Sequence, residues 1–167
     1  LYTPDGRLYI SGAANGRMAQ LWNIRSGKLH ARLPGHHQKI RRITVSPDSS
    51  RLIAWGCDKR GRNPEATLWG MDRAKMIRRF PMVRSHAFSP DGKRLASGGQ
   101  DGGVRIWDPA SGEQIRMLPA PAVLRISYSP DGRRIAGGGS GRSINIWDAR
   151  DYSLIRRHEG RGDEGPR

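Results

Sequence analysis

The sequence predicts an all-β repeat protein of about four antiparallel sheets, each of four short strands, with the first sheet incomplete. The first observation is a Pro-Asp turn that recurs at residues 3–6, 46–49, 89–92 and 129–132, with prolines 43, 43 and 40 residues apart. The second is a tryptophan that ends a short apolar run in each unit: Trp22, Trp69, Trp107 and Trp147. A period of roughly 40–45 residues is typical of units that contain about four strands.

The third unit shows the four strands most clearly. An alternating segment, 83–88, precedes the Pro-Asp turn, and apolar runs follow at 95–98, 104–108 and 114–118. Asp-Gly or Ser-Gly separates each run from the next, as hairpin turns require. The first strand recurs with the same spacing in three units: Ile40, Ile43 and Val45; Val83, His86 and Phe88; Val123, Ile126 and Tyr128. We expect His86, a polar residue at an apolar position, to have a hydrogen-bond partner.

The repeat length and the Trp-Asp dipeptides at 107–108 and 147–148 resemble the WD40 family over residues 1–157. The style of the repeats is similar to that of bacterial members. The resemblance implies a β-propeller, in which each four-stranded sheet is one blade. The expected blades are about 1–34, 38–80, 82–119 and 122–157, followed by a polar, Gly-rich and flexible tail at 158–167.

The first blade retains only Leu1 and Tyr2 of its innermost strand, and no later segment is a candidate to replace it. Because propellers remove exposed sheet edges by closing into a ring, we expect an open fragment of a larger propeller. A compact closure of four blades is the less favoured alternative. Further blades of the same chain or a second copy would complete the ring.

The resemblance also implies a structural hydrogen-bond network of His, Ser, Asp and Trp in each blade. The candidate members are Ser11, Trp22, His36, Asp58, Trp69, Ser97, Asp101, Trp107 and Trp147. No blade has the complete set: Ala54 replaces the serine of blade 2, and Asn15 and Gly141 stand at aspartate positions. We therefore expect turns and apolar packing to hold the blades, and the histidines to be structural rather than catalytic.

Blade 2 contains an insertion between its second and third strands. Leu52 and Trp69 are 17 positions apart, whereas the equivalent Leu95 and Trp107 are 12 apart. The loop at 58–64 is strongly basic, and in WD40 proteins such loops lie on the face that commonly receives partners. The predicted partner-binding residues are Lys59, Arg60 and Arg62, supported by His37, Lys39 and Arg41. The alternative interpretation is a tolerated surface insertion.

The formal net charge of +15 comes from 30 Lys and Arg against 15 Asp and Glu. A nucleic acid is therefore a candidate partner. The arginines are spread over all four repeats, however, and no aromatic residues are interleaved with them as a base-stacking surface requires. A solvated basic exterior is the favoured interpretation.

The chain has no apolar run of the roughly 18 residues that a membrane helix needs, and its start does not resemble a signal peptide. Cys57 is the only cysteine, so no internal disulfide can form. This pattern favours a cytoplasmic protein without membrane contact.

No enzyme motif is apparent. A nucleophile elbow, a phosphate loop and a zinc-binding helix are all missing, and residues 137–141 fall at a hairpin tip. His30, His36 and His37 have no clustered cysteine or carboxylate, so neither a metal nor a cofactor is expected. We expect a non-enzymatic scaffold that binds a protein or peptide. The alternatives are a regulatory or sensory propeller attached to a larger enzyme, such as a bacterial Ser/Thr protein kinase, and a basic propeller that binds nucleic acid.

Overall fold

The computed structural model describes residues 1–12, 16–139 and 143–160. These residues form four antiparallel sheets from fifteen strands and contain no helix, which confirms the all-β prediction. The described residues therefore include no helix that is long and apolar enough to cross a membrane.

Each sheet is one blade, and its strands follow chain order from one edge to the other. Blade 1 has three strands: β1 (Leu8–Gly12), β2 (Ala19–Asn23) and β3 (Leu29–Leu33). Blade 2 has β4 (Lys39–Val45), β5 (Arg51–Cys57), β6 (Glu65–Gly70) and β7 (Lys75–Pro81). Blade 3 has β8 (Val83–Phe88), β9 (Leu95–Gly99), β10 (Val104–Trp107) and β11 (Gln114–Leu118). Blade 4 has β12 (Val123–Tyr128), β13 (Arg134–Gly139), β14 (Ser143–Asp148) and β15 (Leu154–Glu159).

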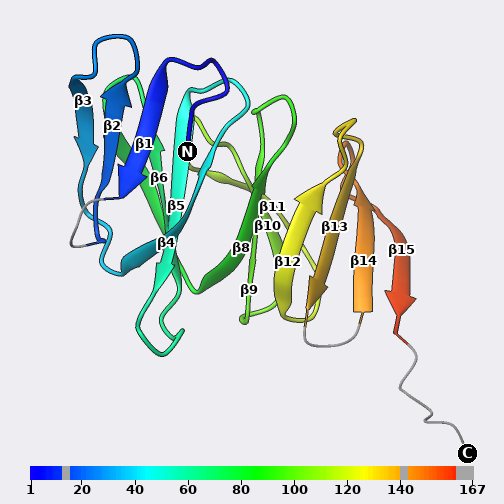
Figure 1. Cartoon of the computed structure of the whole chain (residues 1–167). Helices are drawn as coiled ribbons and strands as arrows, with labels where there is room; N and C mark the ends of the chain where they lie inside the picture. The colour runs from blue at the N-terminus through cyan, green and yellow to red at the C-terminus, as the bar shows by residue number, and fades with distance from the viewer. Residues whose placement is uncertain (13–15, 140–142, 161–167) are drawn as a thin grey trace, which may run out of the picture.

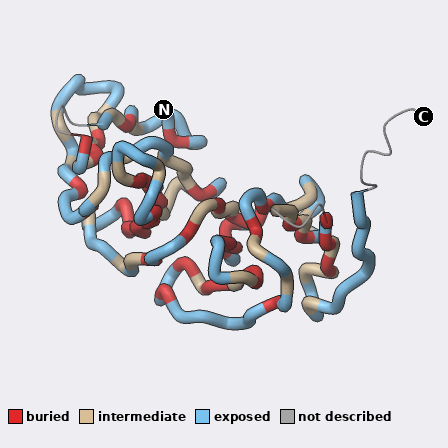
Figure 2. The backbone as a smooth tube through the Cα atoms, turned by 90° about the horizontal axis from the view of Figure 1, so that it is seen from below, coloured by how far each residue is buried: buried red, intermediate tan, exposed pale blue. Residues whose placement is uncertain are grey.

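The four blades stand side by side in one row, with blade 1 and blade 4 at its opposite ends (Figures 1 and 2). The row does not close into a ring. In blade 1, Tyr2 makes only an isolated bridge to Tyr9 where the other blades have a full first strand. The expected open arc with an incomplete first blade is confirmed. The last strand, β15, includes residues 158 and 159, which we expected in the tail, and residues 161–167 lie outside the described part.

The Pro-Asp turns are held by one repeated set of hydrogen bonds. In blade 3, the Ser89 hydroxyl donates to Asp91 Oδ1 (2.5 Å) and accepts from the backbone N–H of Arg94 (2.9 Å). The hydrogen bonds from Ser89 and from the Lys93 N–H lower the pKa of Asp91 below its ordinary value. Ser46 and Ser129 make the same contacts in their own turns. The turn is therefore a local structure that each motif forms with the two residues after it.

The hydrophobic core is divided among the three interfaces between consecutive blades. One cluster joins blades 1 and 2 around Trp69, the next joins blades 2 and 3 around Trp107, and the third joins blades 3 and 4 around Trp147. All three tryptophans are buried. Stability should therefore come largely from contacts between neighbouring blades, as in other repeat proteins.

The first strand of blades 2, 3 and 4 contains a bulge at the same place. The register shifts between Ile40 and Arg42 in β4, and at the equivalent points of β8 and β12. The extra residues are Arg41, Arg84 and Leu124. A glycine lies opposite the residue that precedes each bulge: Gly56, Gly99 and Gly139. A bulge changes the direction of a side chain, so these three positions point differently from the regular strand residues.

Candidate partner-binding face

The inserted loop of blade 2, residues 58–64, is organised by the side chain of Asp58. Asp58 Oδ1 accepts the backbone N–H groups of Arg60 (2.9 Å) and Arg62 (2.7 Å). Arg62 Nε lies 3.6 Å from Asp58 Oδ2. Lys59 and Arg60 are exposed, and neither makes an ion pair within the described residues. The loop thus has a fixed backbone and presents at least two basic side chains to solvent.

The assignment of Asp58 to the His-Trp network needs correction. The carboxylate that meets His36 belongs to Glu65, at the start of β6. Glu65 Oε1 is 2.6 Å from His36 Nδ1 and accepts the backbone N–H of His37 at 2.6 Å and of Gln38 at 3.3 Å. Because the insertion lengthens the loop, Asp58 remains at the loop start and satisfies the loop backbone instead.

Glu65 fixes the connection between β3 and β4. Its Oε2 lies 3.5 Å from His37 Nδ1 and 3.8 Å from Arg79 Nε, and Arg79 also donates to the Gly35 carbonyl. Burial alone would raise the pKa of Glu65, but the hydrogen bonds from His37, His36 and Gln38 outweigh it, and its pKa is lowered. Burial lowers the pKa of His36, so its neutral ring donates Nδ1–H to the carboxylate. A lone glutamate at the start of an otherwise apolar strand was the sequence signal for this role.

Replacing Glu65 by alanine is expected to destabilise the protein by about 3 kcal/mol, because it leaves the buried His36 ring and two backbone N–H groups without an acceptor. Chemical denaturation followed by circular dichroism measures the change. The control is Glu113→Ala, which removes an exposed carboxylate and should change stability by less than about 0.5 kcal/mol. Equal stability of the two variants would show that the Glu65 contacts are not needed.

The other network positions divide into two groups. Trp22 Nε1 donates to Ser11 Oγ (2.9 Å), and Trp107 Nε1 donates to Ser97 Oγ (2.8 Å). Asp101 does not join them: its Oδ2 lies 2.7 Å from Arg105 Nη2, a partly exposed ion pair between the β9–β10 turn and β10. This corrects the assignment of Asp101, because without a histidine in blade 3 the nearest cation takes the carboxylate.

For two further network positions, Trp69 and Trp147, the described residues show no indole hydrogen bond like those of Trp22 and Trp107. The indole ring of Trp69 lies beside the imidazole ring of His36, and their centroids are 6.3 Å apart. Trp147 lies over Gly137, where an added Cβ would be 3.1 Å from the indole. Asn15 and Gly141 lie outside the described residues.

The structure brings only part of the predicted binding set together. The 58–64 loop and the 34–38 connection lie at the same end of the blades, the lower end in Figure 1, and we call this surface the loop face. His37 lies there beside Glu65. Lys39 instead lies across Gly16 of blade 1, where an added Cβ would be 2.6 Å from Lys39 Cγ. Arg41 belongs to the β4 bulge and lines a cavity between blades.

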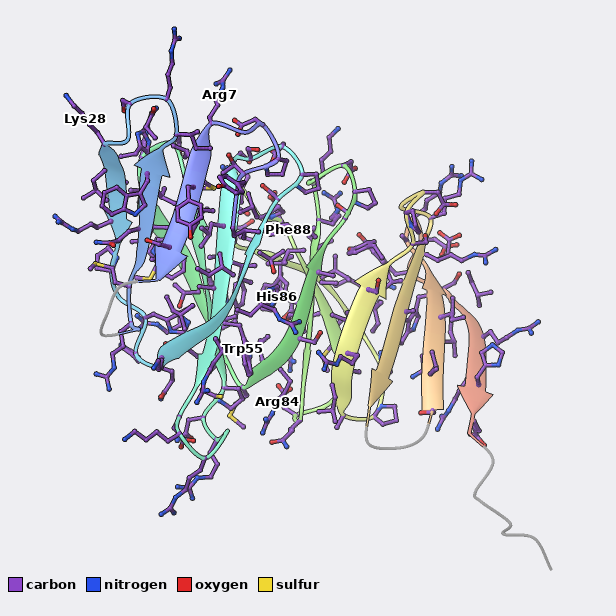
Figure 3. All side chains as sticks on the ribbon, viewed as in Figure 1. Arg7, Lys28, Trp55, Arg84, His86 and Phe88 are labelled. Carbon is purple, nitrogen blue, oxygen red and sulfur yellow. The ribbon has the colours of Figure 1, made fainter. Side chains whose placement is uncertain are left out.

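This cavity, of about 510 Å³, lies where the first strands of blades 2, 3 and 4 converge. Figure 3 shows Trp55, Arg84 and His86 around it, from β5 and β8. His86 Nε2 is 3.1 Å from the Thr44 hydroxyl of blade 2, which supplies the partner that we expected. Burial, and to a smaller degree the positive charge of Arg42, lowers the pKa of His86 to about 4.

His86 should make stability depend on pH between about 6.5 and 4, because the unfolded chain takes up a proton there and the folded chain does not. Stability should fall as pH falls through this window, by up to about 3 kcal/mol. The neighbouring Arg41, Arg42, Arg84 and Arg125 stay charged throughout.

The test is denaturation from pH 7 to 4 in phosphate-free buffer, with His86→Ile as the comparison. Isoleucine occupies the equivalent positions 43 and 126. The variant should lose less stability over this window than the wild type. Identical pH profiles would show that His86 does not contribute.

Among the described residues, no group of three or more His, Cys, Asp and Glu side chains is placed to hold a metal ion. What the described part offers is a basic loop, a buried carboxylate that anchors the neighbouring connection, and an arginine-lined cavity between blades.

Comparison with known proteins agrees with the fold. The family described as "WD domain, G-beta repeat" matches residues 77–108 and 112–148. The small ribosomal subunit protein RACK1y of Oryza sativa subsp. japonica is 30% identical over 108 residues, which are 63% of this chain and 30% of the relative. The WD repeat and SOCS box-containing protein 1 of Homo sapiens is 30% identical over 112 residues, 62% of this chain and 25% of that protein. Protein groucho of Drosophila melanogaster is 29% identical over 119 residues, 68% of this chain and 16% of that protein.

The chain spans less than a third of each of these relatives. The repeat spacing, the four-stranded blades and the family match agree with one another. Residues 77–108 and 112–148 therefore match WD40 repeats, and the four sheets together resemble a fragment of a WD40 propeller.

Proposed function

We propose that this chain is a non-enzymatic scaffold module that binds an acidic segment of a protein partner on its loop face. Similarity to WD-repeat proteins supports a role in protein interaction in general. The choice of face and of partner chemistry comes from the described residues of blade 2. We also propose a cytoplasmic location, on the basis of the single cysteine, Cys57, which is buried and free.

The observation that carries the proposal is the fixed, uncompensated charge of the inserted loop. Asp58 holds the loop backbone, while Lys59 and Arg60 remain exposed and make no ion pair within the described residues. Glu65 anchors the adjacent connection, so that His37 adjoins the same surface. A surface that is already ordered loses little conformational entropy on binding, and its charge steers a partner of opposite sign.

Binding of a fluorescent Glu-rich peptide, measured by anisotropy at low and at physiological salt, tests the proposal. The variant K59A/R60A should bind about 5–30-fold more weakly, because each lost contact contributes about 0.5–1 kcal/mol. The control R7A/K28A also removes two positive charges, but from the opposite end of the blades. Figure 3 labels Arg7 and Lys28 at that end. This control should bind like the wild type.

Two results would contradict the proposal. Equal loss in both double variants would mean that the peptide responds to net charge alone. A DNA duplex that displaces the peptide and binds more tightly at physiological salt would favour the nucleic-acid alternative, which the net charge of +15 motivates.

The same face would also serve a regulatory propeller joined to a larger enzyme such as a bacterial Ser/Thr protein kinase.

A further inference from the structure

The cavity between blades 2, 3 and 4 is lined by four arginines: Arg41 and Arg42 from β4, Arg84 from β8 and Arg125 from β12. No aspartate or glutamate lines it. None of the four makes an ion pair within the described part of the chain. Four like charges that converge without a carboxylate repel one another, and a bound anion would relieve this repulsion.

Two buried polar atoms at the cavity wall also lack a partner. Arg84 Nε and His86 Nδ1 are inaccessible to solvent and form no hydrogen bond in the structure. Buried donors and acceptors are nearly always satisfied in native proteins. His86 uses its other ring nitrogen on Thr44, so the unsatisfied nitrogen remains available.

The backbone is built to place these groups. Arg41 and Arg84 are the extra residues of the bulges in β4 and β8, and a bulge redirects the side chain at that position. Trp55 lines the cavity from β5, where the equivalent positions of blades 3 and 4 are Gly98 and Gly138. Its indole N–H donates to the Val83 carbonyl at 2.5 Å, which fixes the ring between blades 2 and 3. The side chains of this cavity wall therefore differ from those at the equivalent positions of the other blades, and the repeat pattern alone would not produce them.

We propose that this arginine cavity binds a phosphorylated group, carried by a free small molecule or by a side chain of a protein. Guanidinium groups match phosphate oxygens through paired hydrogen bonds. The volume of about 510 Å³ leaves space for an organic part beyond the phosphate and lies within the usual range of ligand pockets. The proposal does not rest on the loop face, because Arg42, Arg84 and Arg125 are not part of it.

Isothermal titration calorimetry of the full chain in phosphate-free buffer tests this with two matched pairs of probes. One pair is AMP and adenosine, and the other is a phosphoserine peptide and its unphosphorylated form. In at least one pair the phosphorylated member should bind at least about tenfold more tightly. The pair that shows the larger difference identifies the source of the phosphate.

Arg84→Gln and Arg125→Gln should each weaken that binding by about 5–30-fold. Arg125 is exposed, so its replacement should not lower the thermal unfolding midpoint, and an unreduced midpoint excludes a folding defect. Arg7→Gln and K59A/R60A should both bind the phosphorylated probe like the wild type. Since K59A/R60A should weaken binding of the acidic peptide, this variant distinguishes the cavity proposal from the scaffold proposal. The proposal is overturned if neither pair shows a preference, if both cavity variants bind normally, or if Arg7→Gln loses as much as they do.

Discussion

Replacing Gly99 by alanine is expected to destabilise the protein by about 3 kcal/mol or more, because the new methyl group has no space. Gly99 lies at the end of β9, opposite Val83 at the start of the bulged strand β8. A Cβ on Gly99 would collide with the carbonyl oxygen of Met82. Since this oxygen belongs to the backbone, β8 itself would have to move, and the bulge that places Arg84 would move with it. Urea denaturation followed by circular dichroism measures the loss.

Gly12→Ala is the matched control. Gly12 ends β1, the corresponding strand of blade 1, and a Cβ there meets no atom within 4 Å. Alanine should therefore be neutral or stabilise by up to about 1 kcal/mol, since it loses less backbone entropy on folding. If Gly99→Ala were as stable as Gly12→Ala, the close approach of β8 and β9 at the bulge would be wrong.

Trp107→Ala should cost about 3–5 kcal/mol, the range for removal of a buried aromatic side chain. Trp107 is 6% exposed and packs edge-on against Phe80 of blade 2, with ring centroids 4.8 Å apart. The Arg78 guanidinium lies 4.9 Å from the indole centroid, so a cation–π contact is lost as well. Because the indole joins two blades, the variant should also make unfolding less cooperative, which differential scanning calorimetry detects.

A double-mutant cycle separates the indole hydrogen bond from the packing. Ser97→Ala removes the acceptor of Trp107 Nε1 and should cost about 1–2 kcal/mol. Trp107→Phe keeps part of the packing, and the double variant should show a coupling of about 0.5–1.5 kcal/mol. Strictly additive losses would show that the hydrogen bond does not contribute.

The fold was predictable from the sequence because its signals are local. Ser89, Asp91 and Gly92 determine one turn within a few residues, and the other blades repeat it. The His36 partner was not predictable in the same way. A five-residue insertion moved the expected aspartate, Asp58, into a loop, and only the pairing of strands shows that Glu65 lies beside the ring.

The arginine cavity was harder to predict than the loop. The repeat spacing alone places Arg41 and Arg84 as regular strand residues, because no local sequence pattern indicates the bulges. No local pattern indicates that the first strands of three blades line one cavity either. His86 could be placed on the innermost strand from its spacing. Its partner, Thr44, comes from the neighbouring blade and depends on how the blades pack.

Site-specific photocrosslinking compares the two ends of the blades directly. A photoreactive amino acid is introduced at position 60 on the loop face, or at position 28 at the opposite end, in cells that naturally produce the protein. We predict a discrete protein adduct from position 60 that disappears when Lys59 and Arg62 are replaced by alanine, and no such adduct from position 28. Equal adducts from both positions, or an adduct that survives the loss of Lys59 and Arg62, would contradict a loop face that selects its partner.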